Sequence, residues 1–157
     1  MAKAGYQAGT EASVALVATT AKTVLGVLAP AQFGCDLRGF EISFDGITTT
    51  DKPVLVEICT ATFATNGPGT NSTSNTVNQV YGRTITAGFT SAYNWTAEPT
   101  VLAVVKQLFL TPNGGTYEYD WPFGETLDNA VSVGWAIRCT APTSAVNVRS
   151  SIRFERC

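Results

Sequence analysis

The sequence predicts an all-β chain: an antiparallel β-sandwich with a jelly-roll-like topology and about eight strands. The chain contains many Thr, Val and Gly residues together with Ser and Asn, and these residues favour pleated strands joined by turns. Several segments alternate apolar and polar residues with a period of two, and no long helical pattern lies between them. A length of 157 residues suits one domain. An immunoglobulin-like sandwich is the alternative topology.

The first 35 residues differ from the rest of the chain. They are rich in Ala and Thr, show no extended alternation, and include the apolar run from Val24 to Leu28. We therefore predict an N-terminal arm or first strand over 1–35, followed by a single β-sandwich domain over 36–157.

Regular alternation begins at Leu37, where Phe40, Ile42 and Phe44 share one face of a half-buried strand. The run 101–110 is apolar apart from Lys106 and Gln107, which predicts a strand that is buried on both faces or central in a sheet. Residues 64–80 are mostly Asn, Thr, Ser, Gly and Pro and predict a long surface loop of the kind that often binds a ligand. Further strands are expected at 53–58, 84–89, 91–96, 117–120, 131–139 and 146–155.

The chain has no histidine, which removes the usual general base and a common zinc ligand. Two carboxylate pairs remain as glycosidase candidates, Glu118 with Asp120 and Glu125 with Asp128. The first pair alternates with tyrosines, as on the solvated face of a strand, and the second lies in a turn-rich stretch. We therefore expect no enzyme activity, no metal and no cofactor.

Four cysteines are spaced too widely for a zinc knuckle. Their even number allows two disulfides, but the segment Met1 to Thr10 lacks the features of a secretory signal, so reduced thiols are expected. Cys59 and Cys139 fall in apolar strands and are interpreted as small buried hydrophobic residues, whereas Cys157 is expected to be exposed.

Charge argues against two classes of partner. Ten basic and twelve acidic residues are scattered without a run of either sign, so no basic patch points to nucleic acid or to an anionic membrane surface. No apolar run is long enough to span a membrane. We expect the protein to be made in the cytoplasm of its host cell.

Aromatic residues offer a binding surface. Trp135 belongs to a core alternation, but Trp95 and Trp121 lie beside turns or strand ends, with Phe123 close by in sequence. An exposed patch of this kind suits a protein interface or, alternatively, a sugar ligand.

Several strand and turn segments resemble small proteins encoded beside the major capsid gene of tailed bacteriophages. The matching segments are 37–46, 53–57, 78–83, 111–115 and 146–149. The resemblance implies a head decoration, or cement, protein with a jelly-roll-like β-sandwich, which binds the major capsid protein at the virion surface, often as a homotrimer.

On this interpretation the interface is expected at two places. The arm would contribute Tyr6, Val24, Leu25, Val27 and Leu28, and the aromatic region Trp95, Trp121 and Phe123. Two alternatives remain open: a carbohydrate-binding module, and a shell-forming or head-fibre-base capsid protein. The lack of a basic arm argues against a shell protein that encloses nucleic acid directly.

Overall fold

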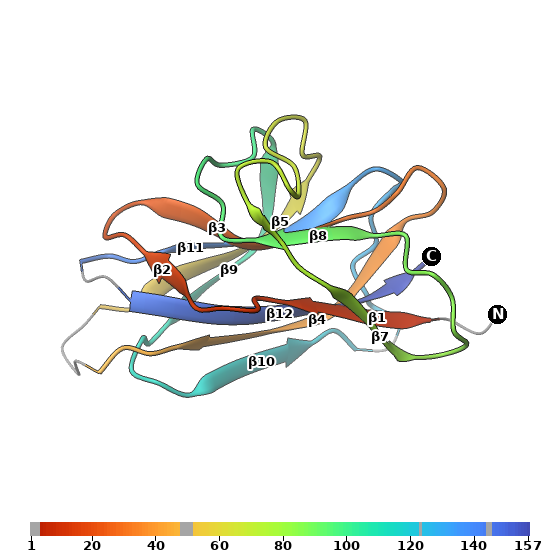
Figure 1. Cartoon of the computed structure of the whole chain (residues 1–157). Coiled ribbons are helices and arrows are strands. Elements are labelled where there is room, and N and C mark those ends of the chain that lie inside the picture. Colours follow the sequence, from red (N-terminus) through yellow and green to blue (C-terminus); the bar gives the residue numbers. More distant parts are fainter. Residues whose placement is uncertain (1–3, 48–51, 123, 144–145) are drawn as a thin grey trace.

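The computed structural model describes residues 4–47, 52–122, 124–143 and 146–157, and these form two six-stranded antiparallel sheets packed face to face (Figure 1). Sheet I has the order β10-β4-β12-β1-β7 with β2 beside β12, and sheet II the order β6-β8-β3-β11-β5-β9. The predicted antiparallel β-sandwich is confirmed. The strands are β1 (Gly5–Gly9), β2 (Val14–Leu16), β3 (Ala21–Leu28), β4 (Cys35–Phe44), β5 (Val54–Ala61), β6 (Thr73–Ser74), β7 (Val77–Tyr81), β8 (Thr90–Tyr93), β9 (Leu102–Leu110), β10 (Thr116–Asp120), β11 (Gly134–Thr140) and β12 (Val146–Arg156).

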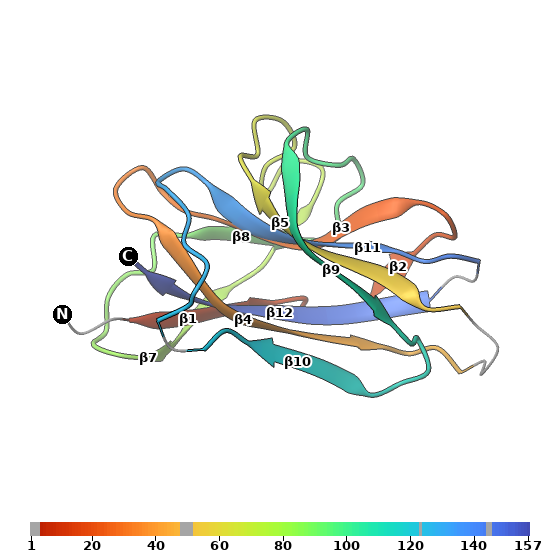
Figure 2. The same cartoon turned by 180° about the vertical axis from the view of Figure 1, so that it is seen from behind.

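The strand pairing is that of a jelly roll. The first half of the chain pairs with the second half in reverse order: β1 with β12, β3 with β11, β4 with β10 and β5 with β9. These nested pairs alternate between the two sheets, as in a long hairpin rolled into a sandwich. The shorter β2, β6, β7 and β8 extend this framework. Figure 2 shows β9 and β10 together along one side of the molecule.

The core lies between the sheets and follows the alternation in the sequence. Phe40 and Ile42 of β4, Ile152 of β12 and Ile137 of β11 are each at most 2% exposed. Trp135 also lies in the core, and its indole nitrogen donates to the Cys35 carbonyl at 3.1 Å. Each such side chain contributes about 1.5–3 kcal/mol by leaving water, which is enough to fix the register of the strands.

A second, smaller apolar layer covers part of the outer face of sheet II. Trp95 and Phe63 stack with ring centroids 6.0 Å apart, and the indole nitrogen of Trp95 donates to the Asn66 carbonyl at 2.6 Å. A Cβ on Gly26 would lie 2.8 Å from the Trp95 ring, so this position needs glycine for close packing. The loops that follow β5 and β8 are thereby fixed to the sheet.

The N-terminal segment forms strands of the sandwich, as in the first-strand alternative, and does not form an arm. β1 lies between β12 and β7, and β3 lies between β11 and β8, so both are interior strands. The Ala-rich and Gly-rich sequence of this segment hides the alternation that would have marked these strands. The division expected at residue 35 therefore has no counterpart in the packing.

Two expected features of the middle of the chain also differ. The 64–80 segment includes β6 and β7, and β7 adds a strand to the edge of sheet I. Residues 84–89, expected as a strand, have no regular structure, because Gln79 accepts from the Ile85 amide at 3.2 Å and holds the chain in a turn.

Candidate interaction surface

The outer edge of sheet II is strand β9, whose far side has no neighbouring strand among the described residues. Phe109 is 74% exposed there, and Val104 and Val105 are also exposed. We call these three residues the edge patch. A nine-residue apolar strand at a sheet edge is a ready site for contact with another protein.

The expected central position of residues 101–110 is therefore wrong. An apolar run indicates only that a strand meets apolar surroundings, and the same pattern suits a core strand and an edge strand covered by a partner. The sequence did contain a signal for an edge, because Lys106 interrupts the run.

Two features of β9 oppose simple pairing with another strand. The register against β5 shifts between Ile58 and Cys59, which leaves Val105 as an extra residue in a bulge. Lys106 points toward the open flank of the sandwich, with its ammonium 4.3 Å from the centre of the Tyr119 ring. Bulges and inward-pointing charges are the devices by which proteins protect sheet edges. Contact at this edge therefore relies on the side chains of the edge patch.

The open flank between β9 and β10 continues this apolar surface. A cavity of about 210 Å³ lies there, lined by Phe44, Leu110 and Tyr117 together with the turn glycines Gly114 and Gly115. Both glycines have positive φ, and added Cβ atoms would meet no neighbour. The flank is thus open to a partner next to the edge patch.

A polar cluster joins three strands beside the edge patch. Glu57 of β5 accepts from Arg138 Nε of β11 at 2.6 Å and from Gln107 Nε2 of β9 at 2.8 Å, and its side chain is only 6% exposed. Burial raises the pKa of Glu57, but the bonds from Arg138 and Gln107 outweigh it and hold the pKa below its usual value. The cluster ties the edge strand to the sheet.

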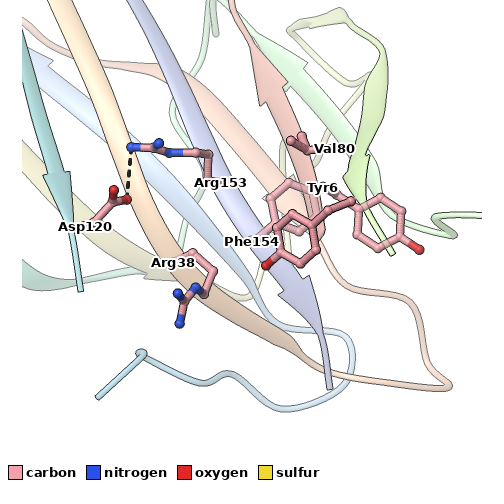
Figure 3. A pocket seen from close by; sticks show the side chains of 7 residues that line it. Tyr6, Arg38, Val80, Asp120, Arg153 and Phe154 are labelled. Carbon is pink, nitrogen blue, oxygen red and sulfur yellow. Dashed lines mark ion pairs between the residues drawn. The ribbon is translucent and has the colours of Figure 1, made fainter. Parts of the chain in front are cut away.

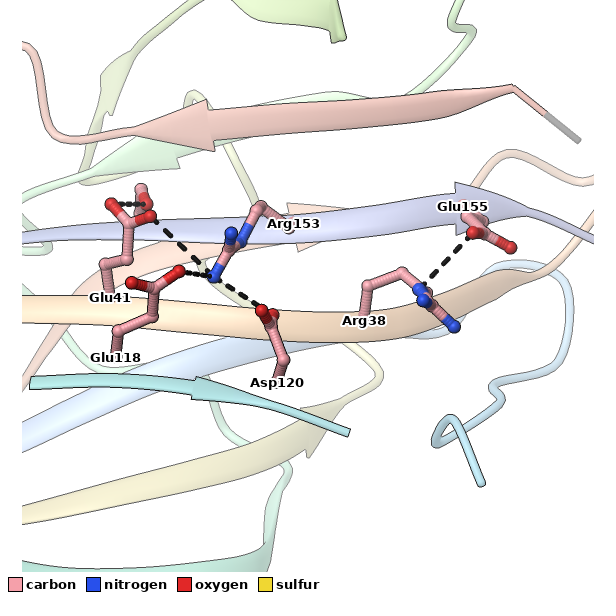
Figure 4. A network of polar contacts seen from close by, with 7 residues as sticks. Arg38, Glu41, Glu118, Asp120, Arg153 and Glu155 are labelled. Atoms are coloured by element: carbon pink, nitrogen blue, oxygen red, sulfur yellow. Dashed lines mark hydrogen bonds and ion pairs between the residues drawn. The ribbon is translucent and has the colours of Figure 1, made fainter. Parts of the chain in front are cut away.

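The outer face of sheet I carries a second charged network, shown in Figure 4. One nitrogen of Arg153 lies 2.5 Å from Glu118, 2.9 Å from Asp120 and 3.7 Å from Glu41. The two carboxylates considered for a glycosidase therefore bind a guanidinium group, which agrees with the solvated strand face that the alternation predicted. Glu125 and Asp128 are exposed in the loop before β11.

Most of the residues expected at an interface lie in the interior. Val24, Leu25 and Val27 are fully buried, and Tyr6 and Trp95 are each 1% exposed. Leu28 is half-buried and packs against the layer that contains Trp95. A buried side chain offers nothing to a partner, so the contact expected at these buried positions is wrong for the folded chain.

Trp121 is half-buried, and its ring lies 5.0 Å from that of Tyr119 and 6.0 Å from that of Phe40. It closes the end of the core beside β10 instead of forming a patch with Trp95. Phe123 lies outside the described residues. The sugar-binding alternative relied on Trp95 and Trp121 as an exposed aromatic pair, and Trp95 is buried while Trp121 is half-buried.

The cysteines follow the prediction, because all four are free thiols. Cys35, Cys59 and Cys139 are buried and Cys157 is exposed. Within the described ranges no group of three or more Cys, Asp or Glu side chains is arranged to hold a metal ion. The same part of the chain contains no helix long and apolar enough to cross a membrane.

A comparison with protein-family models, with curated proteins and with solved structures finds no significant match to this chain.

Proposed function

We propose that this protein is a structural virion component that decorates and stabilises the outer surface of a bacteriophage capsid. The sequence resemblance supplies the role, and the observation that carries it on the structural side is the edge patch on β9. The patch leaves Phe109 74% exposed, with Val104 and Val105 also exposed, on a strand at the edge of its sheet. Covering it with capsid protein or with a sister subunit would remove that apolar surface from water.

Stabilisation of the capsid follows from mass action. A protein that binds the expanded shell better than its precursor shifts the equilibrium toward the expanded form. Burying one phenylalanine contributes about 1.5–3 kcal/mol, and the same contact is repeated at every copy around the shell. Many modest contacts therefore add up to a stable coat.

A homotrimer is the oligomer that we favour. A symmetric dimer formed by antiparallel backbone pairing of two β9 strands is opposed by the bulge at Val105 and the inward Lys106. Contact between the edge patch of one copy and a different surface of the next closes into a ring, of which the trimer is a common case. The major capsid protein and sister subunits are then the partners.

The first test is the mass of the protein in solution, measured by size exclusion with light scattering. We expect a trimer for the unmodified chain and a shift toward monomer for Phe109→Ser at the same concentration. The matched control is Val131→Ser, which removes an exposed valine from the loop before β11 and leaves the trimer intact.

The second test mixes the protein with empty heads assembled from the major capsid protein encoded beside it. We expect binding to expanded heads, weaker binding to unexpanded heads, and loss of binding for Phe109→Ser. A monomer that ignores both kinds of head would refute the proposal.

A further inference from the structure

A groove crosses the outer face of sheet I, away from the edge patch. It has a volume of about 200 Å³, and its walls include Tyr81 and Val80 of β7, Arg38 of β4, Arg153 of β12 and Asp120 of β10 (Figure 3). These residues come from four strands of one sheet, so the groove has a rigid floor.

Tyr81 forms one wall as a fixed aromatic platform. Its ring lies over Gly5 of β1, and a Cβ at Gly5 would collide with the ring atoms. The Tyr81 hydroxyl donates to Glu155 of β12, whose side chain is 6% exposed and lies 3.3 Å from Arg38 Nε. One face of the ring thus rests on the backbone while the residue remains 48% exposed. A ligand that stacks on the free face meets a ring that is already ordered.

Asp120 forms the opposite wall through a second glycine. A Cβ at Gly39 of β4 would collide with the Asp120 carboxylate, which lies across the strand and reaches Arg153 at 2.9 Å. The lack of side chains at Gly5 and Gly39 therefore leaves room at the surface of the sheet. The Tyr81 ring lies over Gly5 at one end of the groove, and Asp120, paired with Arg153, lies over Gly39 at the other. A side chain at Gly5 would displace the Tyr81 ring, and one at Gly39 would displace the Asp120 carboxylate.

The charge of the groove argues against an anionic ligand. Arg153 is surrounded by Glu41, Glu118 and Asp120, and Arg38 is paired with Glu155. Carboxylates outnumber guanidinium groups in this network, so a phosphate or carboxylate would be repelled. A neutral ligand with many hydroxyl groups can accept from guanidinium N–H groups and donate to carboxylates at the same time.

We propose that this groove binds a neutral pyranose sugar, with the C–H face of the sugar ring on Tyr81 and its hydroxyls on Arg38, Arg153 and Asp120. The aromatic platform suits the apolar face of such a ring, and the polar pairs suit its rim of hydroxyls. The site uses none of the edge patch, so it stands whether or not the protein decorates a capsid. Free hexoses and the terminal residues of neutral polysaccharides share this chemistry.

The test is a screen of the full chain on an array of neutral and acidic glycans, followed by titration of the best ligand by calorimetry. Free neutral hexoses form a separate arm that distinguishes a single sugar from a longer glycan. We expect binding of neutral glycans, weakened at least about tenfold by Tyr81→Ala, which corresponds to about 1.4 kcal/mol. Tyr81→Phe keeps the ring but loses the bond to Glu155, and should weaken binding less.

Val131→Ser is the matched control, because it removes an exposed apolar side chain outside both the groove and the edge patch and should leave sugar binding unchanged. Circular dichroism of each variant shows whether it is folded. Three results would overturn the proposal: no neutral glycan bound by the folded chain, binding of acidic glycans alone, or binding of equal strength after Tyr81→Ala. None of them affects the trimer and head-binding tests.

Discussion

At the scale of single residues, the cysteines show how burial controls chemistry. Burial raises the pKa of Cys35 and Cys139, and it raises the pKa of Cys59 to about 11. Cys157 is exposed, yet partial burial and the neighbouring Asp36 raise its pKa to about 11 as well. Since the thiolate is the reactive form, all four thiols are poor nucleophiles near neutral pH.

Thiol modification therefore reports the fold directly. We expect a maleimide or iodoacetamide reagent at pH 8 to modify only Cys157 in the native protein, and to do so slowly. All four cysteines should react in urea. Mass spectrometry of the intact protein counts the modified thiols, and rapid native labelling of Cys139 would contradict its burial.

Trp95 is a residue whose role the sequence concealed. It supports the layer outside sheet II through its stack on Phe63 and its bond to the Asn66 carbonyl. We expect Trp95→Ala to lower the free energy of unfolding by about 3–5 kcal/mol, as for other large core truncations. Trp121→Ala, at a half-buried position, should cost less. Urea denaturation followed by circular dichroism measures both, and equal losses would contradict the second apolar layer.

At the scale of elements, the Glu57 cluster connects β5, β9 and β11. Because the pKa of Glu57 is lowered in the folded chain, its contribution to stability is present above the ordinary glutamate pKa of about 4.3. That contribution is lost as the pH falls through the lowered, folded-state pKa. We expect the free energy of unfolding to decrease between pH 5 and pH 3.

The variant Glu57→Gln tests this dependence. It should be less stable than the unmodified chain at pH 7 and should show a flatter pH profile in urea denaturation. Glu125→Gln, at an exposed position in the loop before β11, is the control and should keep the original profile. Identical slopes for Glu57→Gln and the unmodified chain would exclude the cluster as the source.

Strand β9 allows a test of edge protection. Deleting Val105 would remove the bulge and restore a continuous register with β5, and Lys106→Val would remove the inward charge. We expect the combined change to produce aggregates that grow with concentration, measured by light scattering, because the edge would then pair with copies of itself. Removing Gly115 from the neighbouring turn is a control that leaves the edge protected.

The success of sequence reasoning differed between elements for physical reasons. β4 could be predicted because one face is buried and the other is polar, as with Phe40, Ile42 and Phe44 against Glu41 and Ser43. β1 is short and consists largely of Gly and Ala, and β3 has buried residues on both faces, so neither shows such a contrast. Nothing in the sequence near Trp95 shows that a loop packs over it, because that contact depends on Asn66 and Gly26 from distant segments.

The candidate site shows the same limit. The apolar run of β9 was visible in the sequence, but its place at the sheet edge depends on the order of the strands, which local patterns do not encode. The groove of the sugar proposal is equally non-local, because Tyr81 lies over Gly5 and bonds to Glu155, and these three residues are more than 70 positions apart in sequence.

At the scale of the whole molecule, the jelly roll places the first and last strands side by side. β1 pairs with β12 from Gly5 opposite Glu155 to Gly9 opposite Ser151. Such contacts between the ends of a chain are formed late, because the entropy of closing a long loop precedes any gain from the contact. Folding should therefore be slow, which stopped-flow fluorescence of the tryptophans can measure.

During synthesis on the ribosome this arrangement delays the completion of sheet I. β12 is the last strand to emerge, and β1 and β4 both need it as a neighbour in sheet I. A nascent chain in which β12 has not yet emerged therefore carries an incomplete sheet I with exposed apolar faces. Chains stalled before Val146 should be cleaved readily by protease, whereas chains extended by a C-terminal linker should resist it.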